Sequence, residues 1–331
     1  MEPVIIGIDV GATSISGGLL TPQGEVLTAV ESPTRRQGNA LDTLMAVVDE
    51  LVERARNRRF HLEGVGVGLP GIVDIDRGMV VSSMNLVPEL AHVAVAEHLQ
   101  ASTGVPAFVE NDVNALAVGQ LTFGLGRGAR SLAVVAVGTG VGGALVLDGR
   151  LVRGHSGCAG EFGHMPVERD GPPCICGRRG CLNQRVGGRA LAETATRLLA
   201  MGMASSLSGL ADGDTQEITA ARIFEAAEAG DPLARQLVDG ACQALGVAVG
   251  AIINAVDPGL IIITGGVATS LARFEPDIRA AVAAHALAPA LAGTSIRFVP
   301  VDKRQTVRGG AALVLYELGR RGERPATASQ P

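Results

Sequence analysis

The chain has 331 residues, of which 45 are glycine, 2% are aromatic and only Lys303 is a lysine, and its net charge is −5. Twice the usual share of glycine, combined with 47% hydrophobic residues, excludes collagen and disorder and indicates many tight turns. The Gly-Lys-Ser/Thr sequence of a P-loop is absent, and an acidic chain with so few aromatic residues is not expected to bind nucleic acid.

The first part of the chain predicts strands followed by helices. Helical spacing of apolar residues predicts a helix from Leu41 to Ala55, and Asp112 is expected to cap another that reaches about Leu121. A further helix is predicted at 89–100. Apolar runs between turn residues predict strands at 4–10, 14–20, 24–30, 65–69 and 107–110.

The order strand, small-residue turn, strand then occurs a second time. Strands are predicted at 132–137 and 141–147, with Asp148-Gly149 as a hairpin turn, so the segments 4–20 and 132–147 resemble one unit used twice. Later elements are helices around 189–201, 217–229, 232–254, 272–286 and 308–319 and strands at 260–263 and 295–299. No basic segment precedes the strand that starts at Val4 and no convincing membrane span occurs, so a cytoplasmic protein is expected.

Three glycine-containing turns could hold parts of a nucleotide: the first two could hold phosphate groups through backbone N–H groups, and the third could accommodate an adenosine. The first turn runs from Asp9 through Gly11 to Thr13, and the carboxylate of Asp9 could hold Mg²⁺ through water. The second is Gly138-Thr139-Gly140-Val141-Gly142-Gly143, and the third is Thr264-Gly265-Gly266. Each turn also has a purely structural interpretation. The first could be a plain hairpin, the second a tight packing corner and the third an ordinary turn at the end of a strand.

Glu110-Asn111-Asp112 lies at a predicted strand-to-helix junction. Asp112 there is either a helix N-cap or a general base that takes a proton from a substrate hydroxyl, with Asn111 orienting the substrate. The two roles are compatible.

One histidine and three cysteines lie within 18 residues, in the pattern H-x₉-C-x-C-x₄-C. Three thiolates and one imidazole suit a closed tetrahedral Zn²⁺ site, which makes the predicted zinc structural. The predicted ligands are His164, Cys174, Cys176 and Cys181. Cys158 and Cys242 remain outside this set.

Two motifs carry a resemblance to a known family: Gly157-x-Ala159-Gly160-Glu161-x-Gly163-His164 and Cys174-x-Cys176-Gly177-x-x-Gly180-Cys181-Leu182. The chain resembles the ROK family of sugar kinases and repressors, within the superfamily of actin and hexokinase, over about residues 4–319. The resemblance implies an α/β fold of two actin-like (ribonuclease H-like) domains with a duplicated βββαβα core and a deep interdomain cleft. It implies a small domain of 1–113 and 308–320, a large domain of 114–307 with a zinc loop at 154–188, and a disordered tail at 321–331.

The resemblance also implies an ATP- and Mg²⁺-dependent hexose 6-kinase that works as a homodimer. Asp112 would be the general base, and Asn85, Asn111, Asp112, Glu161, His164 and Asn183 would bind the sugar. The nucleotide would be held by Asp9, Gly11, Thr13, Gly138, Thr139, Gly140, Gly142, Gly265 and Gly266.

Two departures from the family pattern concern the sugar pocket. Asn183 stands where the kinases usually carry glutamate, and the tryptophan common after the residue corresponding to Asn85 is missing. An amino or otherwise modified hexose is therefore a possible substrate besides glucose, and polyphosphate is an alternative donor. The alternative function is a sugar-sensing regulator without turnover, which is disfavoured because the first strand begins at Val4 and Asp112 is retained.

Overall fold

The computed structural model describes residues 1–82, 86–210, 218–300 and 302–323. The chain divides into two compact units. Unit 1 comprises Met1–Gly128, Arg153–Cys158 and the segment from Asp302 onward, and unit 2 comprises Ala129–Val152 and Ala159–Val301. The chain therefore enters unit 1 three times.

A five-stranded sheet forms the centre of unit 1, in the order β3-β2-β1-β4-β7. The first two pairs in this order are antiparallel, whereas β1, β4 and β7 are parallel. The strands are β1 (Pro3–Val10), β2 (Ser14–Leu20), β3 (Val26–Pro33), β4 (His61–Leu69) and β7 (Ala107–Asn111).

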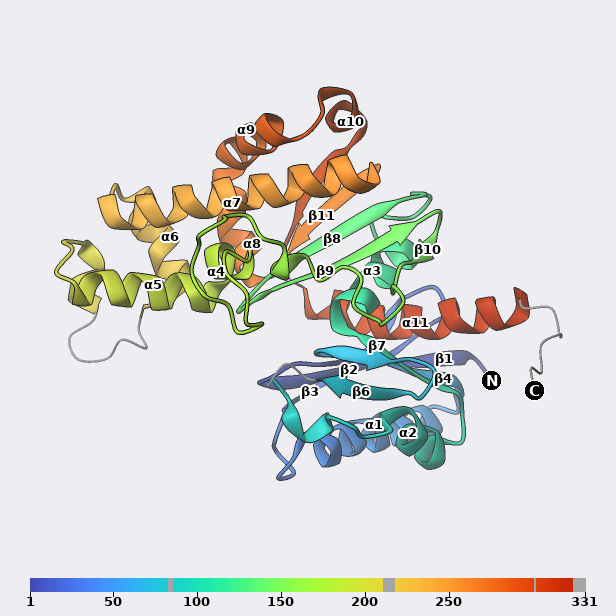
Figure 1. Cartoon of the computed structure of the whole chain (residues 1–331). Coiled ribbons are helices and arrows are strands. Elements are labelled where there is room, and N and C mark those ends of the chain that lie inside the picture. Colours follow the sequence, from blue (N-terminus) through green and yellow to red (C-terminus); the bar gives the residue numbers. More distant parts are fainter. Residues whose placement is uncertain (83–85, 211–217, 301, 324–331) are drawn as a thin grey trace. The chain divides into compact units, whose positions relative to one another are not determined.

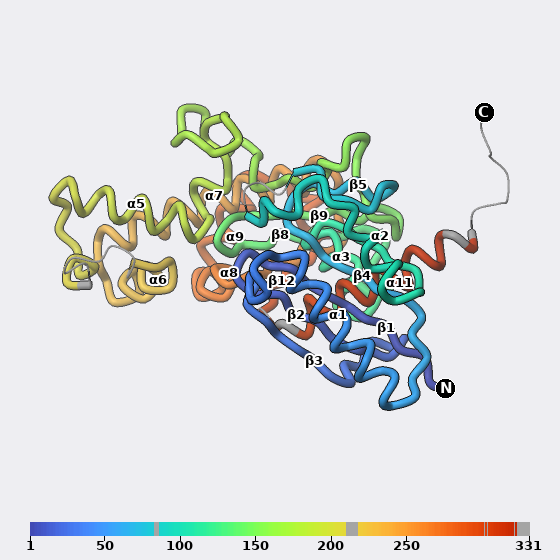
Figure 2. The backbone as a smooth tube through the Cα atoms, turned by 90° about the horizontal axis from the view of Figure 1, so that it is seen from below, coloured from blue at the N-terminus to red at the C-terminus, as the bar shows by residue number. Residues whose placement is uncertain are grey.

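Helices cover both faces of this sheet, which explains why β1 is apolar from Val4 to Ile8. On one face, α1 (Ala40–Asn57) packs on β1, and α2 (Val95–Thr103) lies beside α1 and contacts β7, so that both helices belong to the apolar cluster of Val4, Ile6 and Ile8 (Figures 1 and 2). On the other face, α11 (Lys303–Glu323) packs on Ile5 and beside α3 (Asp112–Phe123) (Figure 1). The last helix of the chain thus completes the core around its first strand.

Glycines allow α11 to lie directly on the strands. A Cβ added to Gly66 on β4 would lie 1.9 Å from the carbonyl oxygen of Gly310 on α11. A Cβ on Gly310 would in turn lie 2.6 Å from the backbone nitrogen of Ile8. Backbone therefore contacts backbone, and side chains at these positions would push the helix off the sheet.

Unit 2 repeats the sheet of unit 1. Its strand order is β10-β9-β8-β11-β12, again with two antiparallel pairs followed by parallel strands. The strands are β8 (Leu132–Val137), β9 (Val141–Leu147), β10 (Arg150–Leu151), β11 (Leu260–Thr264) and β12 (Ser295–Val299). The predicted duplication and the actin-like α/β fold are therefore confirmed.

The helices of unit 2 include one that is long and apolar enough to cross a membrane. This helix, α7 (Pro232–Val256), is 61% buried in its most apolar window and forms part of the core of the unit, so it is read as a core helix. The remaining helical segments are η2 (Phe162–His164), α4 (Asn183–Val186), α5 (Gly188–Ala200), η3 (Ser206–Leu210), α6 (Ala220–Glu228), α8 (Gly266–Leu271), η5 (Ala272–Phe274), α9 (Glu275–His285) and α10 (Ala288–Gly293).

The predicted helix at 89–100 is confirmed only from Val95 onward. The segment forms a short turn, η1 (Pro88–Leu90), and the helix α2 begins only at Val95. Between them, His92 has a φ of 62° and donates its backbone N–H to Val80 O at 2.7 Å. That bond ties the segment to a hairpin that was not predicted, β5 (Ile72–Asp74) and β6 (Met79–Ser82).

Other boundaries also differ from the predictions. The third strand begins two residues later than expected, the helix expected near 272–286 is split into η5 and α9, and α8 was not predicted. The final helix extends beyond 308–319 at both ends, so residues 321–323 of the expected tail lie in α11. Residues 324–331 lie outside the described part of the chain.

Candidate functional site

The junction of β7 and α3 carries the predicted base, but its cap is a different residue. Asn111, not Asp112, is the N-cap: its Oδ1 accepts the N–H groups of Val113 and Asn114 at 3.0 and 3.1 Å. Its Nδ2 donates to Gly71 O at 3.0 Å. Because Asn111 satisfies the free amides of the first turn, Asp112 becomes the first residue of the helix, where the helix dipole favours a negative charge.

Asp9 lies near Asp112 at one end of the unit 1 sheet. The register pairs Asp9 of β1 with Gly68 of β4, and Gly68 with Glu110 of β7. A Cβ added to Gly68 would lie 3.7 Å from Asp9 Oδ1 and 3.2 Å from Asp112 Cα. The carboxyl ends of three parallel strands thus bring together two acidic residues that are far apart in the sequence, at the edge where open α/β sheets bind ligands.

Burial changes the acidity of Asp9. It raises the pKa of the carboxyl from 3.8 to about 6, against the opposing effect of a hydrogen bond with the Thr306 side chain. No ion pair is formed with Asp9 by the side chains that the structure describes. A partly desolvated carboxylate of this kind favours a nearby cation.

The turn after Asp9 is closed by backbone hydrogen bonds. Gly11 donates its N–H to Ser14 O at 2.9 Å, and Gly11 O accepts the hydroxyl of Thr34 at 2.7 Å. The backbone N–H of Thr34 donates to Thr13 O at 3.0 Å. The turn joins two antiparallel strands as a hairpin, and Thr34, directly after β3, braces it.

The glycine-rich turn between β8 and β9 contains glycines with different surroundings. A Cβ on Gly143 would lie 2.3 Å from the Phe162 ring, so this glycine is required by packing. A Cβ on Gly138 would meet no described atom within 4 Å, and the same holds for Gly266 after β11. Packing therefore explains Gly143 but leaves Gly138 and Gly266 as positions that a ligand could approach.

The carbonyl groups of this turn are held by the start of α5. Gly188 donates its N–H to Gly138 O at 2.9 Å, and Arg189 donates to Thr139 O at 3.1 Å. The N–H groups of Thr139 and Gly140 donate no hydrogen bond to any residue that the structure describes. Gly142 pairs with Ala136 in the strand ladder, and Gly265 at φ 109° precedes α8.

Val141 brings the predicted sugar-binding residues of unit 2 together. Its N–H donates to Asn183 Oδ1 at 2.8 Å. Its carbonyl oxygen would lie 2.0 Å from a Cβ on Gly163, the glycine between Glu161 and His164. The backbone amide of Val141 thus fixes Asn183 Oδ1 and with it the orientation of the side-chain amide.

The four predicted zinc ligands lie together in unit 2. Their ligand atoms are all within 4.8 Å of one another, with 3.6 Å between Cys174 Sγ and His164 Nδ1 and 3.6 Å between Cys176 Sγ and Cys181 Sγ. Tetrahedral zinc places its ligand atoms about 3.5–3.8 Å apart, so the cluster fits that ion. Burial and the neighbouring thiols raise the pKa of the Cys181 thiol, so a bound cation is needed to keep it as thiolate.

Asn85, which was predicted to bind the sugar, lies outside the described residues.

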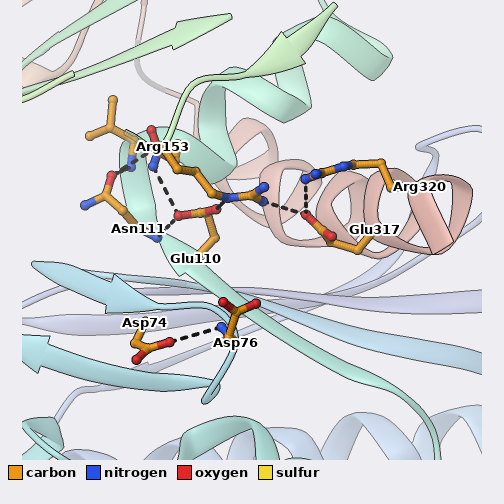
Figure 3. Close-up of polar contacts among 9 residues, drawn as sticks. Asp74, Asp76, Glu110, Asn111, Arg153, Glu317 and Arg320 are labelled. Atoms are coloured by element: carbon orange, nitrogen blue, oxygen red, sulfur yellow. Dashed lines mark hydrogen bonds and ion pairs between the residues drawn. The ribbon is translucent and has the colours of Figure 1, made fainter. Parts of the chain in front are cut away.

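The structure also contains an ion-pair network that was not predicted: Arg153 contacts Glu110 and Glu317 (Figure 3). Its members are separated by 43 and 164 positions, so no local pattern links them.

Comparison with known proteins places the chain in a family. The model of the ROK family matches residues 5–317. The glucokinase of Halalkalibacterium halodurans is 33% identical over 314 residues, which cover 93% of this chain and 94% of the relative. The structure of a ROK family glucokinase from Streptomyces griseus with glucose and AMPPNP is 30% identical, covers 94% of this chain and 98% of its own, and has a TM-score of 0.72.

A regulator is also similar in structure. A ROK family transcriptional regulator, a homologue of the Escherichia coli Mlc protein, superposes with a TM-score of 0.82 at 25% identity, over 96% of this chain and 79% of its own. Kinases and regulators thus share the fold found here, and the chain belongs to the ROK family.

Proposed function

We propose that this protein is an ATP- and Mg²⁺-dependent hexose kinase in which Asp112 takes the proton from the sugar 6-hydroxyl. The observation that carries the proposal is the proximity of Asp9 and Asp112 on either side of Gly68, at one end of the unit 1 sheet. Phosphoryl transfer requires one residue beside the attacking oxygen and charge neutralisation at the phosphates. Asp112 fits the first role, and Asp9 fits the second through a metal ion.

The nucleotide phosphates would be held without a lysine. The N–H groups of Thr139 and Gly140 and the open space at Gly138 suit a phosphate cradle, and Gly265 and Gly266 would lie near the nucleoside. Asp9, with Gly11 and Thr13 in the adjoining turn, would hold Mg²⁺, which neutralises phosphate charge when bound. The raised pKa of Asp9 supports this assignment, because a bound cation would offset the energetic cost of holding its charged carboxylate away from water.

The sugar would be recognised by Glu161, His164, Asn183 and Asn111, with zinc fixing the imidazole. Because Nδ1 of His164 faces Cys174, a zinc ion bound there leaves Nε2 protonated and free to donate to a sugar hydroxyl. With its Oδ1 bonded to the Val141 N–H, Asn183 would supply a neutral N–H donor at the position where the family resemblance leads us to expect glutamate. We therefore include amino-hexoses and other modified hexoses with glucose as candidate substrates.

A sugar-sensing regulator is the second candidate, because the regulator structure superposes with a TM-score of 0.82. Such a protein would bind sugar and release no ADP. A homodimer is a part of the proposal that rests on the family resemblance, and a cytoplasmic location is a part that rests on the sequence analysis.

Coupled measurement of ADP release tests the proposal. Purified protein is assayed with ATP, with and without Mg²⁺, against glucose and a panel of hexoses and amino-hexoses, and polyphosphate replaces ATP in a parallel series. We expect sugar-dependent ADP release that requires Mg²⁺. Sugar binding by calorimetry without any ADP release would instead favour the regulator.

A further inference from the structure

A buried ionic network adjoins the residue proposed as base (Figure 3). Arg153 donates from Nε to Glu110 Oε2 and from Nη2 to Glu317 Oε1, each at 2.5 Å. The exposed fraction is 3% for the side chain of Glu110, 14% for Arg153 and 18% for Glu317. Burial lowers the pKa of Arg153, but the charges and hydrogen bonds of the two glutamates raise it by more. The guanidinium therefore stays charged.

The second oxygen of Glu110 reaches the junction that carries Asp112. Glu110 Oε1 accepts the backbone N–H of Asn111 at 2.9 Å and the side-chain amide of Asn114 at 3.1 Å. Asn111 is the N-cap of α3, and Asp112 is its first residue. A single buried carboxylate thus binds Arg153 with one oxygen and the backbone immediately before Asp112 with the other.

Arg153 joins three segments of unit 1 that are remote in sequence. It is the first residue of the short segment Arg153–Cys158, Glu110 lies in β7, and Glu317 lies in α11. The rigid fork of the guanidinium places two donors toward two carboxylates at once, which the single ammonium of lysine does not reproduce. Loss of Arg153 would leave Glu110 with an uncompensated buried charge.

We infer that Arg153 is a positioning residue for Asp112. It fixes the carboxylate of Glu110, and through it the backbone of Asn111, so that the first turn of α3 presents Asp112 in one place. The consequence for turnover rests on the proposed function, because a displacement of about 1 Å at a reacting group can cost a factor of about 10² in rate.

Arg320 provides a matched control. Like Arg153, Arg320 contacts Glu317, with 3.7 Å between its Nη1 and Glu317 Oε1. Both arginines also lie over the ring of Tyr316, with their Cζ atoms 5.6 Å (Arg320) and 5.9 Å (Arg153) from the ring centroid. No ion pair or hydrogen bond of the described residues joins it to Glu110. The variants Arg153→Met, Arg153→Lys and Arg320→Met therefore separate the contact with Glu110 from the contacts with α11.

Amide hydrogen exchange and steady-state kinetics are measured on the full chain. We expect Arg153→Met to increase exchange in peptides that cover 109–116 and to lower kcat by about 10–100-fold, with the KM for ATP within about twofold. Arg153→Lys, which keeps the charge, should lie between wild type and Arg153→Met. Arg320→Met should match wild type in both measurements.

Unchanged exchange at 109–116 in both Arg153 variants would overturn the inference, and so would faster exchange with an unchanged kcat. If kcat in the variants falls only in proportion to the fraction of folded protein, as measured by thermal melting, the role of Arg153 is merely structural. If Arg153→Met does not fold, Arg153→Lys decides both points. Wild-type protein without turnover would contradict the proposed function, whereas the exchange comparison would still decide whether Arg153 holds the junction.

Discussion

Asp9 illustrates how a residue proposed to serve function can reduce stability. Its carboxyl has a pKa of about 6 in the folded protein and 3.8 without the effects of the fold. The folded state therefore binds the proton more tightly than the unfolded state, and stability is lost as pH rises from about 4 through 6. A shift of about two units corresponds to about 3 kcal/mol at neutral pH.

Removal of this charge should therefore stabilise the magnesium-free protein. We predict that Asp9→Asn gains about 1–3 kcal/mol in free energy of unfolding at pH 7.5, that the gain disappears near pH 4, and that Mg²⁺-dependent turnover is lost. Urea denaturation at both pH values measures the effect. Glu53→Gln, on the exposed side of α1, is the control for charge alone. An Asp9→Asn protein no more stable than wild type at pH 7.5 would contradict this account of Asp9.

At the scale of elements, the contact between α11 and the sheet depends on glycine at specific positions. Gly310 and Gly319 lie on the same helix, but a Cβ on Gly310 would lie 2.5 Å from Gly66 O, whereas a Cβ on Gly319 would meet nothing within 4 Å. We predict that Gly310→Ala costs about 1–3 kcal/mol in free energy of unfolding. Gly319→Ala should be neutral or gain up to about 1 kcal/mol, because alanine favours helix. Equal effects of the two substitutions in urea denaturation would show that the helix does not pack as described.

The cysteine-containing loop is the second element with a direct test. We predict that elemental analysis finds about one zinc ion per chain in the wild-type protein. The variant Cys181→Ser should lose the zinc ion, become sensitive to proteolysis in residues 154–188 and bind sugar more weakly. Cys158→Ser is the control, because Cys158 is exposed and lies outside the cluster. Zinc-free wild-type protein, or full sugar affinity in Cys181→Ser, would argue against the site.

At the scale of the whole molecule, the duplicated fold was predictable because its signals are local. Each copy begins with an apolar strand, a small-residue turn and a returning strand, and the segments that carry them are continuous in sequence. The metal cluster was predictable for the same reason, since its ligands lie within 18 residues.

Features that depend on distant contacts were not predictable. The helix expected at 89–100 begins only at Val95, because the backbone of His92 is bonded to a strand of the unpredicted hairpin. The choice between Asn111 and Asp112 as cap depends on backbone geometry that propensity does not distinguish. The contacts of Arg153 with β7 and α11 join residues that only the completed fold brings together.

Comparison of wild type with Asp112→Asn tests the central claim most directly. Asparagine keeps the size of the side chain and its contact with the Val113 N–H but cannot accept the substrate proton at neutral pH. The measurement is kcat by coupled ADP release on the best hexose, beside the sugar Kd by calorimetry. The account predicts a kcat lower by about 10²–10⁴-fold with the Kd little changed. Turnover within a few-fold of wild type would contradict the assignment of Asp112 as the base.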